Sequence, residues 1–103
     1  MWLMLNKGFI SIVNKEGSYV ARSRKKEHLE AYFPHSEIIS GAGTDYKYRV
    51  FLNDEELRDF FTRLPDEINY TNFKSSIDVE KEPVYKNVCS DLWHSLATAF
   101  WGR

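Results

Sequence analysis

The clearest pattern of the chain lies between residues 46 and 61, where two periodicities follow one another. Over residues 46–52, aromatic and branched side chains alternate with Lys47, Arg49 and Phe51. A period of two is typical of a strand with one buried face. After residue 52, the apolar positions recur at intervals of three and four, which is typical of an amphipathic helix. The stretch therefore predicts a strand that runs directly into a helix.

The start and the end of this helix are both marked. Asn53 is a suitable N-cap, and residues 54–56 are acidic, which suits the positive end of the helix dipole. Glu56 stands three residues after Asn53, the spacing of a capping box. Pro65 predicts the end, because the residue before a proline is driven out of the helical region. The apolar stripe consists of Leu57, Phe60, Phe61 and Leu64.

The N-terminal third predicts strands and a hairpin. Residues 2–5 and 9–13 are apolar runs on either side of Gly8. Either one long strand with a bend at Gly8 or two short strands with a tight link fits this pattern. Residues 14–17 predict a turn with a glycine at its last position, and residues 18–23 predict the partner strand.

A short helix is predicted over residues 25–33, with Ser23 as its candidate cap and Pro34 as its end. Residues 37–40 are a short apolar run, and the turn chemistry of 41–45 predicts a second hairpin that leads into the strand at 46–52.

The two halves therefore share the order ββα. Tyr19–Arg22 resembles Tyr46–Arg49, and the apolar positions of the first helix resemble those of the second. Either a structural repeat or a chance similarity between two amphipathic units explains the match.

The C-terminal third begins with a segment, residues 66–80, whose pattern fits a strand, a helix or a loop. Pro83 then suits the first turn of a helix, and Gly102 suits its end. This helix carries apolar residues at every fourth position, and we expect it to pack on the sheet or on a second subunit. These residues are Val84, Val88, Leu92, Leu96 and Phe100, flanked by Tyr85, Cys89 and Trp93.

Together these elements predict a single α+β domain over residues 1–103. We expect a four-stranded antiparallel sheet built from two ββα units, a ferredoxin-like or double-ββα sandwich, with the C-terminal amphipathic helix as an addition. The length of 103 residues suits one domain with a real core.

Charge and cysteine content exclude several classes. The formal net charge of −1 gives no global field that would recruit nucleic acid or an anionic membrane. A single cysteine excludes an intrachain disulfide framework and a cysteine-rich zinc site. We see no signal peptide and no apolar run of about 20 residues, so we expect a cytoplasmic protein with no membrane contact.

Candidate catalytic groups are sparse. His28 and His35 have no second ligand three or four residues away, so zinc is not indicated. Cys89 and His94 lie five residues apart on a predicted helix and face different directions, so they form no nucleophile–base pair. We therefore expect no catalytic residue, no metal and no cofactor.

Two groups of residues are candidates for binding. The first combines a basic run with tyrosines, which suits a nucleic acid or a nucleotide; its alternative is the solvated end of a strand. The second lies in the irregular segment after residue 68 and is either a binding loop or a plug of the core. The first group is Arg22, Arg24, Lys26, Tyr46, Tyr48 and Arg49, and the second is Asn72, Phe73 and Lys74.

Several short motifs also resemble a family of short uncharacterised proteins of bacteria, phages and plasmids. They are Met1-Trp2, Lys7-Gly-Phe-x-Ser-Ile-Val13, Val20-Ala-Arg22, Asp45-Tyr-x-Tyr-Arg-Val50, Ile68-Asn-Tyr-x-Asn-Phe-Lys74, Tyr85 and Trp93. Family members usually carry Asp-Tyr where this chain has Asn69-Tyr70. The resemblance implies no activity, but it draws attention to Arg22, Arg49, Tyr48 and residues 72–74 as a common surface.

The sequence therefore favours a non-enzymatic module that binds or regulates a protein partner, with a homodimer as one possible assembly. The alternative is a nucleic-acid or nucleotide-binding protein that uses a basic and aromatic face of the sheet. An enzyme whose residues come together from distant parts of the chain is the third hypothesis.

Overall fold

The structure, a computed structural model, describes residues 1–41 and 45–101. The chain divides into two compact units, Met1–Asn69 and Tyr70–Arg103. The single domain over 1–103 stays a prediction. The central residues of the expected turn at 41–45 and the expected helix end at Gly102 lie outside the described residues.

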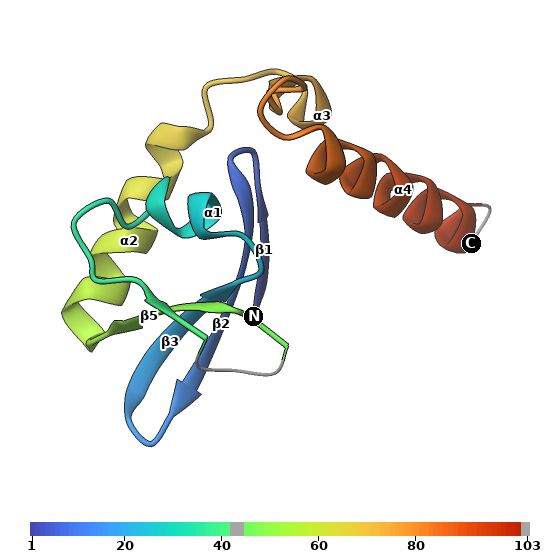
Figure 1. Cartoon of the computed structure of the whole chain (residues 1–103). Coiled ribbons are helices and arrows are strands. Elements are labelled where there is room, and N and C mark those ends of the chain that lie inside the picture. The colour runs from blue at the N-terminus through green and yellow to red at the C-terminus, as the bar shows by residue number, and fades with distance from the viewer. Residues whose placement is uncertain (42–44, 102–103) are drawn as a thin grey trace. The chain divides into compact units, whose positions relative to one another are not determined.

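The first unit is α+β with an antiparallel sheet, as predicted, but the sheet has five strands rather than four. The strand order is β1-β2-β3-β5-β4 (Figure 1). The additional strand arises because the chain reverses at residues 6–7, so that Leu5 pairs with Gly8. The strands are β1 (Trp2–Leu5), β2 (Gly8–Lys15), β3 (Ser18–Ser23), β4 (Ile39–Ser40) and β5 (Tyr48–Leu52).

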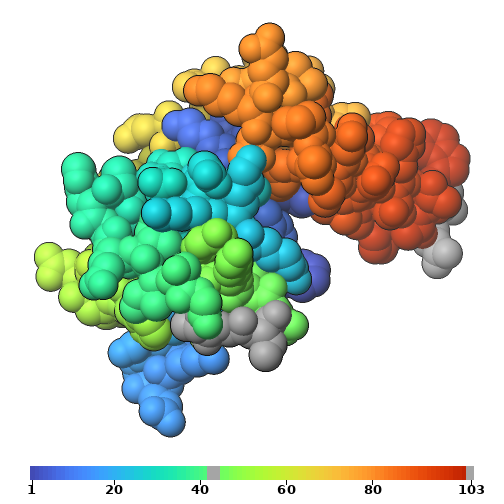
Figure 2. All heavy atoms as spheres, viewed as in Figure 1, coloured from blue at the N-terminus to red at the C-terminus, as the bar shows by residue number. Residues whose placement is uncertain are grey.

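The turn between β2 and β3 follows the prediction. Glu16 and Gly17 both have positive φ, 54° and 86°, which matches a turn suited to the twist of a hairpin. The side-chain oxygen of Asn14 accepts a hydrogen bond from the Gly17 amide at 3.1 Å. Figure 2 shows this blue hairpin tip projecting from the first unit.

Two strands are shorter than the sequence pattern predicts. β5 begins at Tyr48 rather than at residue 46, and β4 covers only Ile39–Ser40 of the expected run 37–40. The alternating pattern over residues 46–52 therefore extends beyond the residues that pair. β4 is an edge strand whose only partner among the described residues is β5.

The helix α1 (Lys26–Glu30) is shorter than the predicted 25–33, and its N-cap is Lys25 rather than Ser23. Ser23 instead forms hydrogen bonds at the end of β3, before the helix begins. Its hydroxyl donates to the Phe9 carbonyl at 3.1 Å and accepts from the Lys25 amide at 3.2 Å. The serine therefore ties the end of β3 to β2 before the helix starts.

The helix α2 (Asp54–Glu67) has the predicted capping box. The Glu56 amide donates to the Asn53 side chain at 2.8 Å, and the Asn53 amide donates to the Glu56 carboxylate at 2.9 Å. The prediction that Pro65 ends the helix is wrong, because α2 continues to Glu67. A proline in the last turn removes one donor only, and its fixed φ is itself helical.

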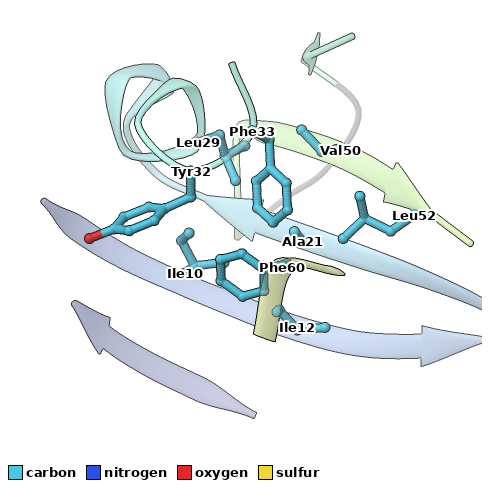
Figure 3. Packing of buried hydrophobic residues seen from close by; sticks show 9 residues of the cluster. All are labelled: Ile10, Ile12, Ala21, Leu29, Tyr32, Phe33, Val50, Leu52 and Phe60. Atoms are coloured by element: carbon cyan, nitrogen blue, oxygen red, sulfur yellow. The ribbon is translucent and has the colours of Figure 1, made fainter. Parts of the chain in front are cut away.

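Both α1 and α2 pack on the same face of the sheet (Figure 1). Phe60 of α2 lies at the centre of the core, with its ring centroid 4.8 Å from that of Phe33 and 6.2 Å from that of Tyr32. Figure 3 shows the side chains that meet between the helices and the strands. They are Ile10, Ile12, Ala21, Leu29, Tyr32, Phe33, Val50, Leu52 and Phe60.

The second unit contains α3 (Phe73–Ser76) and α4 (Pro83–Phe100). Residues 66–80, which the sequence left open, supply the end of α2 and the short α3. Pro83 begins α4 in the first turn, as predicted. The buried side chains of this unit include Ile77, Tyr85 and Cys89. Of the helices in the described part of the chain, none has the length and apolar character needed to cross a membrane.

Candidate functional site

The pairing of the strands assigns each strand residue to one of two faces. One face lies under α1 and α2. The opposite face, which we call the outer face, includes a continuous row across all five strands. The row runs Trp2, Ser11, Arg22, Arg49 and Ile39, each paired directly with the next.

Arg22 and Arg49 are the two charged residues of this row, and they are half-buried neighbours. Arg22 donates a hydrogen bond from Nη2 to the Ser11 hydroxyl at 2.8 Å. The Nε atoms of Arg22 and Arg49 are buried and have no hydrogen-bond partner. Within residues 1–41 and 45–101, no carboxylate forms an ion pair with either guanidinium.

Tyr46, a predicted stacking residue, has its ring covered by arginines of the same chain. The Cζ atoms of Arg22 and Arg24 each lie 4.5 Å from the centroid of the Tyr46 ring. Only 6% of Tyr46 is exposed. The tyrosine therefore positions the two guanidinium groups and offers no free ring face to a ligand.

The remaining residues of the first predicted group do not gather on the outer face. Tyr48 lies on the opposite face from Arg49 and packs against the core. Lys26 begins α1, so the extended arrangement that would align it with Arg22 and Arg24 does not form. Of the first predicted group, the structure thus brings together Arg22, Arg24, Tyr46 and Arg49.

Aromatic side chains on the outer face come from residues that the sequence analysis did not select. Trp2 is 76% exposed, and its ring lies edge-on to that of Phe9 with 5.7 Å between centroids. Phe51 lies on the same face two residues after Arg49 and is 54% exposed. The alternation from Arg49 to Phe51 was visible in the sequence, but the pairing that places Trp2 in the row of Arg22 was not.

The second predicted group lies in the second unit and forms contacts within it. Asn72 caps α3, since its side chain accepts from the Ser75 amide at 3.0 Å. Phe73 packs on Tyr70, with 6.0 Å between ring centroids. Lys74 places its Nζ 4.2 Å from the centroid of a Trp93 ring. Lys74 therefore joins α3 to α4, while Asn72 and Phe73 stabilise α3 and the residues next to it.

The helix α4 presents a second candidate surface. The apolar residues at every fourth position, Val84, Val88, Leu92, Leu96 and Phe100, are all exposed, and we call them the α4 ridge. Their exposure ranges from 40% at Leu92 to 74% at Val84. Within the second unit the buried residues of α4 are Tyr85 and Cys89. The packing of the stripe on the sheet or on a second subunit stays a prediction.

One hollow of the first unit is lined by titratable side chains, and two of these side chains already form structural contacts. His35, Glu56 and Asp59 line a hollow of about 430 Å³ beside Phe33. Glu56 belongs to the capping box, and Asp59 accepts from Arg63 at 3.0 Å. Over the residues that the structure describes, no group of three or more potential ligands could hold a metal ion.

His28 is buried on its short helix. Its Nδ1 accepts a hydrogen bond from the Phe9 amide at 3.2 Å, and its ring lies directly over Gly8. Cys89 is also buried, and this burial raises the pKa of its thiol, while a hydrogen bond with Tyr85 acts in the opposite direction. Both side chains are part of the packing of their units.

Comparison of the chain with protein-family models, with curated proteins and with solved structures gives no match.

Proposed function

We propose that this protein is a non-enzymatic module that binds a protein partner through the α4 ridge. The observation that supports this proposal is the exposure of five large apolar side chains on successive turns of one helix. Contiguous apolar patches of this kind are uncommon on isolated soluble surfaces and mark interaction sites. A partner groove that receives residues four apart along a helix is a common mode of recognition.

The opposite face of α4 argues for a protein rather than a lipid surface. Helices that lie on membranes carry many lysines and arginines on their polar face. On α4 the polar positions are mostly uncharged, and Lys86 is the only lysine or arginine of the helix. The polar face includes Asn87, Ser90, Asp91, His94 and Thr98.

The test compares two matched pairs of substitutions on α4. Leu92→Glu with Leu96→Glu places two carboxylates on the ridge. Asn87→Glu with Thr98→Glu adds the same charge to exposed positions outside it. Each purified protein is immobilised and exposed to cell lysate after nuclease treatment, and the retained proteins are identified.

We expect a partner that is retained by the unmodified protein and by the control pair and lost from the ridge pair. Equal retention by both pairs would contradict the proposal. Light scattering after size exclusion measures the oligomeric state. If the partner is a second copy of the chain, we expect a homodimer for the unmodified protein and a monomer for the ridge pair. Circular dichroism of both pairs establishes that the helices remain folded.

The finer predictions remain part of the same proposal. The order β2-β3-α1 followed by β4-β5-α2 supports a double-ββα arrangement within the larger sheet, which we propose is related to ferredoxin-like sandwiches. We also propose the cytoplasm as location and membership of the uncharacterised bacterial and phage family, on the motifs around Asp45 and Asn72.

A further inference from the structure

The outer face of the sheet differs in charge from the chain as a whole. The whole chain has a formal net charge of −1. Among the strand residues that the structure describes, those on the outer face include Lys15, Arg22 and Arg49 and no aspartate or glutamate. Arg24 continues the same side of the chain beyond β3. The outer face is therefore a local cationic surface on a nearly neutral protein.

The two central arginines leave strong donors unused. Their Nε–H groups are buried without a partner, although buried donors are nearly always hydrogen-bonded. Like charges directly opposite each other on neighbouring strands also destabilise a sheet. An oxyanion between Arg22 and Arg49 would reduce the repulsion and accept hydrogen bonds from both guanidinium groups.

Exposed aromatic rings flank this pair. Trp2 lies in the same row as Arg22, with Ser11 between them, so two strand spacings of roughly 10 Å in total separate their backbones. Phe51 follows Arg49 on the other side. Accessible rings on either side of an arginine pair suit bases that are not stacked in a duplex.

We propose that the outer face binds single-stranded nucleic acid, with a phosphodiester group at Arg22 and Arg49 and bases stacked on Trp2 and Phe51. A sheet with exposed aromatic rings is a surface on which separated bases stack, whereas a duplex exposes its phosphates and hides its bases. This site uses none of the residues of the α4 ridge. A test of nucleic-acid binding at this site is therefore independent of a test of the protein-binding function.

The test measures fluorescence anisotropy of labelled oligothymidylate and oligouridylate of about 20 nucleotides with the full chain. The variant carries Arg22→Gln and Arg49→Gln. Its matched control carries Arg58→Gln and Arg63→Gln, which removes the same charge from exposed positions of α2. Salt is varied between about 50 and 200 mM, because phosphate contacts release counterions.

We expect the outer-face variant to lose at least about tenfold in affinity and about 1.4 in the slope of log affinity against log salt, which corresponds to two phosphate contacts at about 0.7 each. The affinity of the control should stay within about twofold of that of the unmodified protein, although the control has the same net charge as the outer-face variant. Trp2→Leu should weaken binding by about five- to hundredfold, and Trp2→Phe should restore most of it.

Several results would overturn the proposal. One is equal loss in the outer-face variant and its control. A second is equal binding of polyglutamate, which would identify general attraction of polyanions. A third is full displacement by inorganic phosphate or a mononucleotide at similar concentration, which would assign the face to a small oxyanion. If the glutamine pair does not fold, Arg22→Lys with Arg49→Lys keeps the charge and should still reduce affinity, because lysine lacks the planar fork.

Discussion

Arg22 and Arg49 stand directly opposite each other on the two strands, β3 and β5, that join the halves of the first unit. They are also the matching residues of the two similar segments Tyr19–Arg22 and Tyr46–Arg49. When two copies of one ββα pattern pair antiparallel through their second strands, a residue near the centre meets its own counterpart. The juxtaposition of the arginines is therefore a consequence of the repeated order and of the register.

The first prediction concerns the cost of this juxtaposition. We expect Arg49→Gln to raise the free energy of unfolding by about 0.2–1 kcal/mol at low salt, since it removes a like-charge cross-strand pair. The gain should shrink as salt screens the repulsion. Urea denaturation at two salt concentrations measures both quantities. Arg58→Gln is the control, because it removes a favourable pair with Asp54 on α2 and should slightly lower stability. A loss of stability for Arg49→Gln at both salt concentrations would show that the arginine pair is a net stabilising feature.

The second prediction concerns Gly8 and His28. A Cβ atom at residue 8 would lie 2.3 Å from Cγ of the His28 ring, and the φ of Gly8 is 157°. We expect Gly8→Ala to lower the free energy of unfolding by about 2–4 kcal/mol, because overlap of this kind typically costs 1–3 kcal/mol and the backbone conformation adds strain.

Gly17→Ala is its matched control. Gly17 also has a positive φ, 86°, but nothing lies within 4 Å of the added Cβ. Its cost should be about 1–2 kcal/mol, from backbone strain alone. Thermal unfolding of both variants separates overlap from strain. A Gly8→Ala variant no less stable than Gly17→Ala would show that the His28 ring moves away without penalty.

Local signals predicted much of the fold. The change of period after residue 52, the cap at Asn53 and the turn before Gly17 are short-range features, and each is present in the structure. Pro65 was misleading because a proline near the end of a helix removes only one hydrogen-bond donor, and α2 continues past it to Glu67. The hairpin at residues 6–7 also involved an open choice, which only the pairing of Leu5 with Gly8 decides.

The candidate site was less predictable, since its residues come together through strand register. The run from Arg22 to Lys26 drew attention as a linear motif, yet α1 interrupts it at Lys26. Tyr46 was selected as a stacking residue, and its ring is instead covered by Arg22 and Arg24. No local pattern places Trp2 in the same row as Arg22, because two pairings across β2 are required.

The third prediction concerns the capping box of α2. We expect Asn53→Ala to lower the free energy of unfolding by about 1 kcal/mol, because the Glu56 amide loses its acceptor. Glu56→Ala removes the reciprocal bond to the Asn53 amide and should also lower the free energy of unfolding, because that amide then loses its acceptor. A double-mutant cycle by urea denaturation measures the coupling. Strict additivity of the two losses would contradict a reciprocal box.

The last prediction concerns the pH dependence that Cys89 introduces. Burial raises the pKa of the folded thiol, so the neutral form is retained in the folded chain to higher pH than in the unfolded chain. Above the ordinary thiol pKa of about 8.5, the unfolded chain therefore binds fewer protons than the folded chain. The free energy of unfolding should fall as pH rises from that value to the pKa of the folded thiol.

Cys89→Ala isolates the contribution of this thiol to the pH dependence of stability. The variant should be less stable at pH 7, because a buried side chain is shortened, and its stability should decline less steeply at alkaline pH. Urea denaturation of both proteins between pH 7 and about 10 gives the difference in slope. Parallel pH profiles would show that the Cys89 thiol ionises equally in both states. Reaction of Cys89 with a thiol reagent should correspondingly be slow in the folded protein and fast in denaturant, since the thiolate is the reactive form.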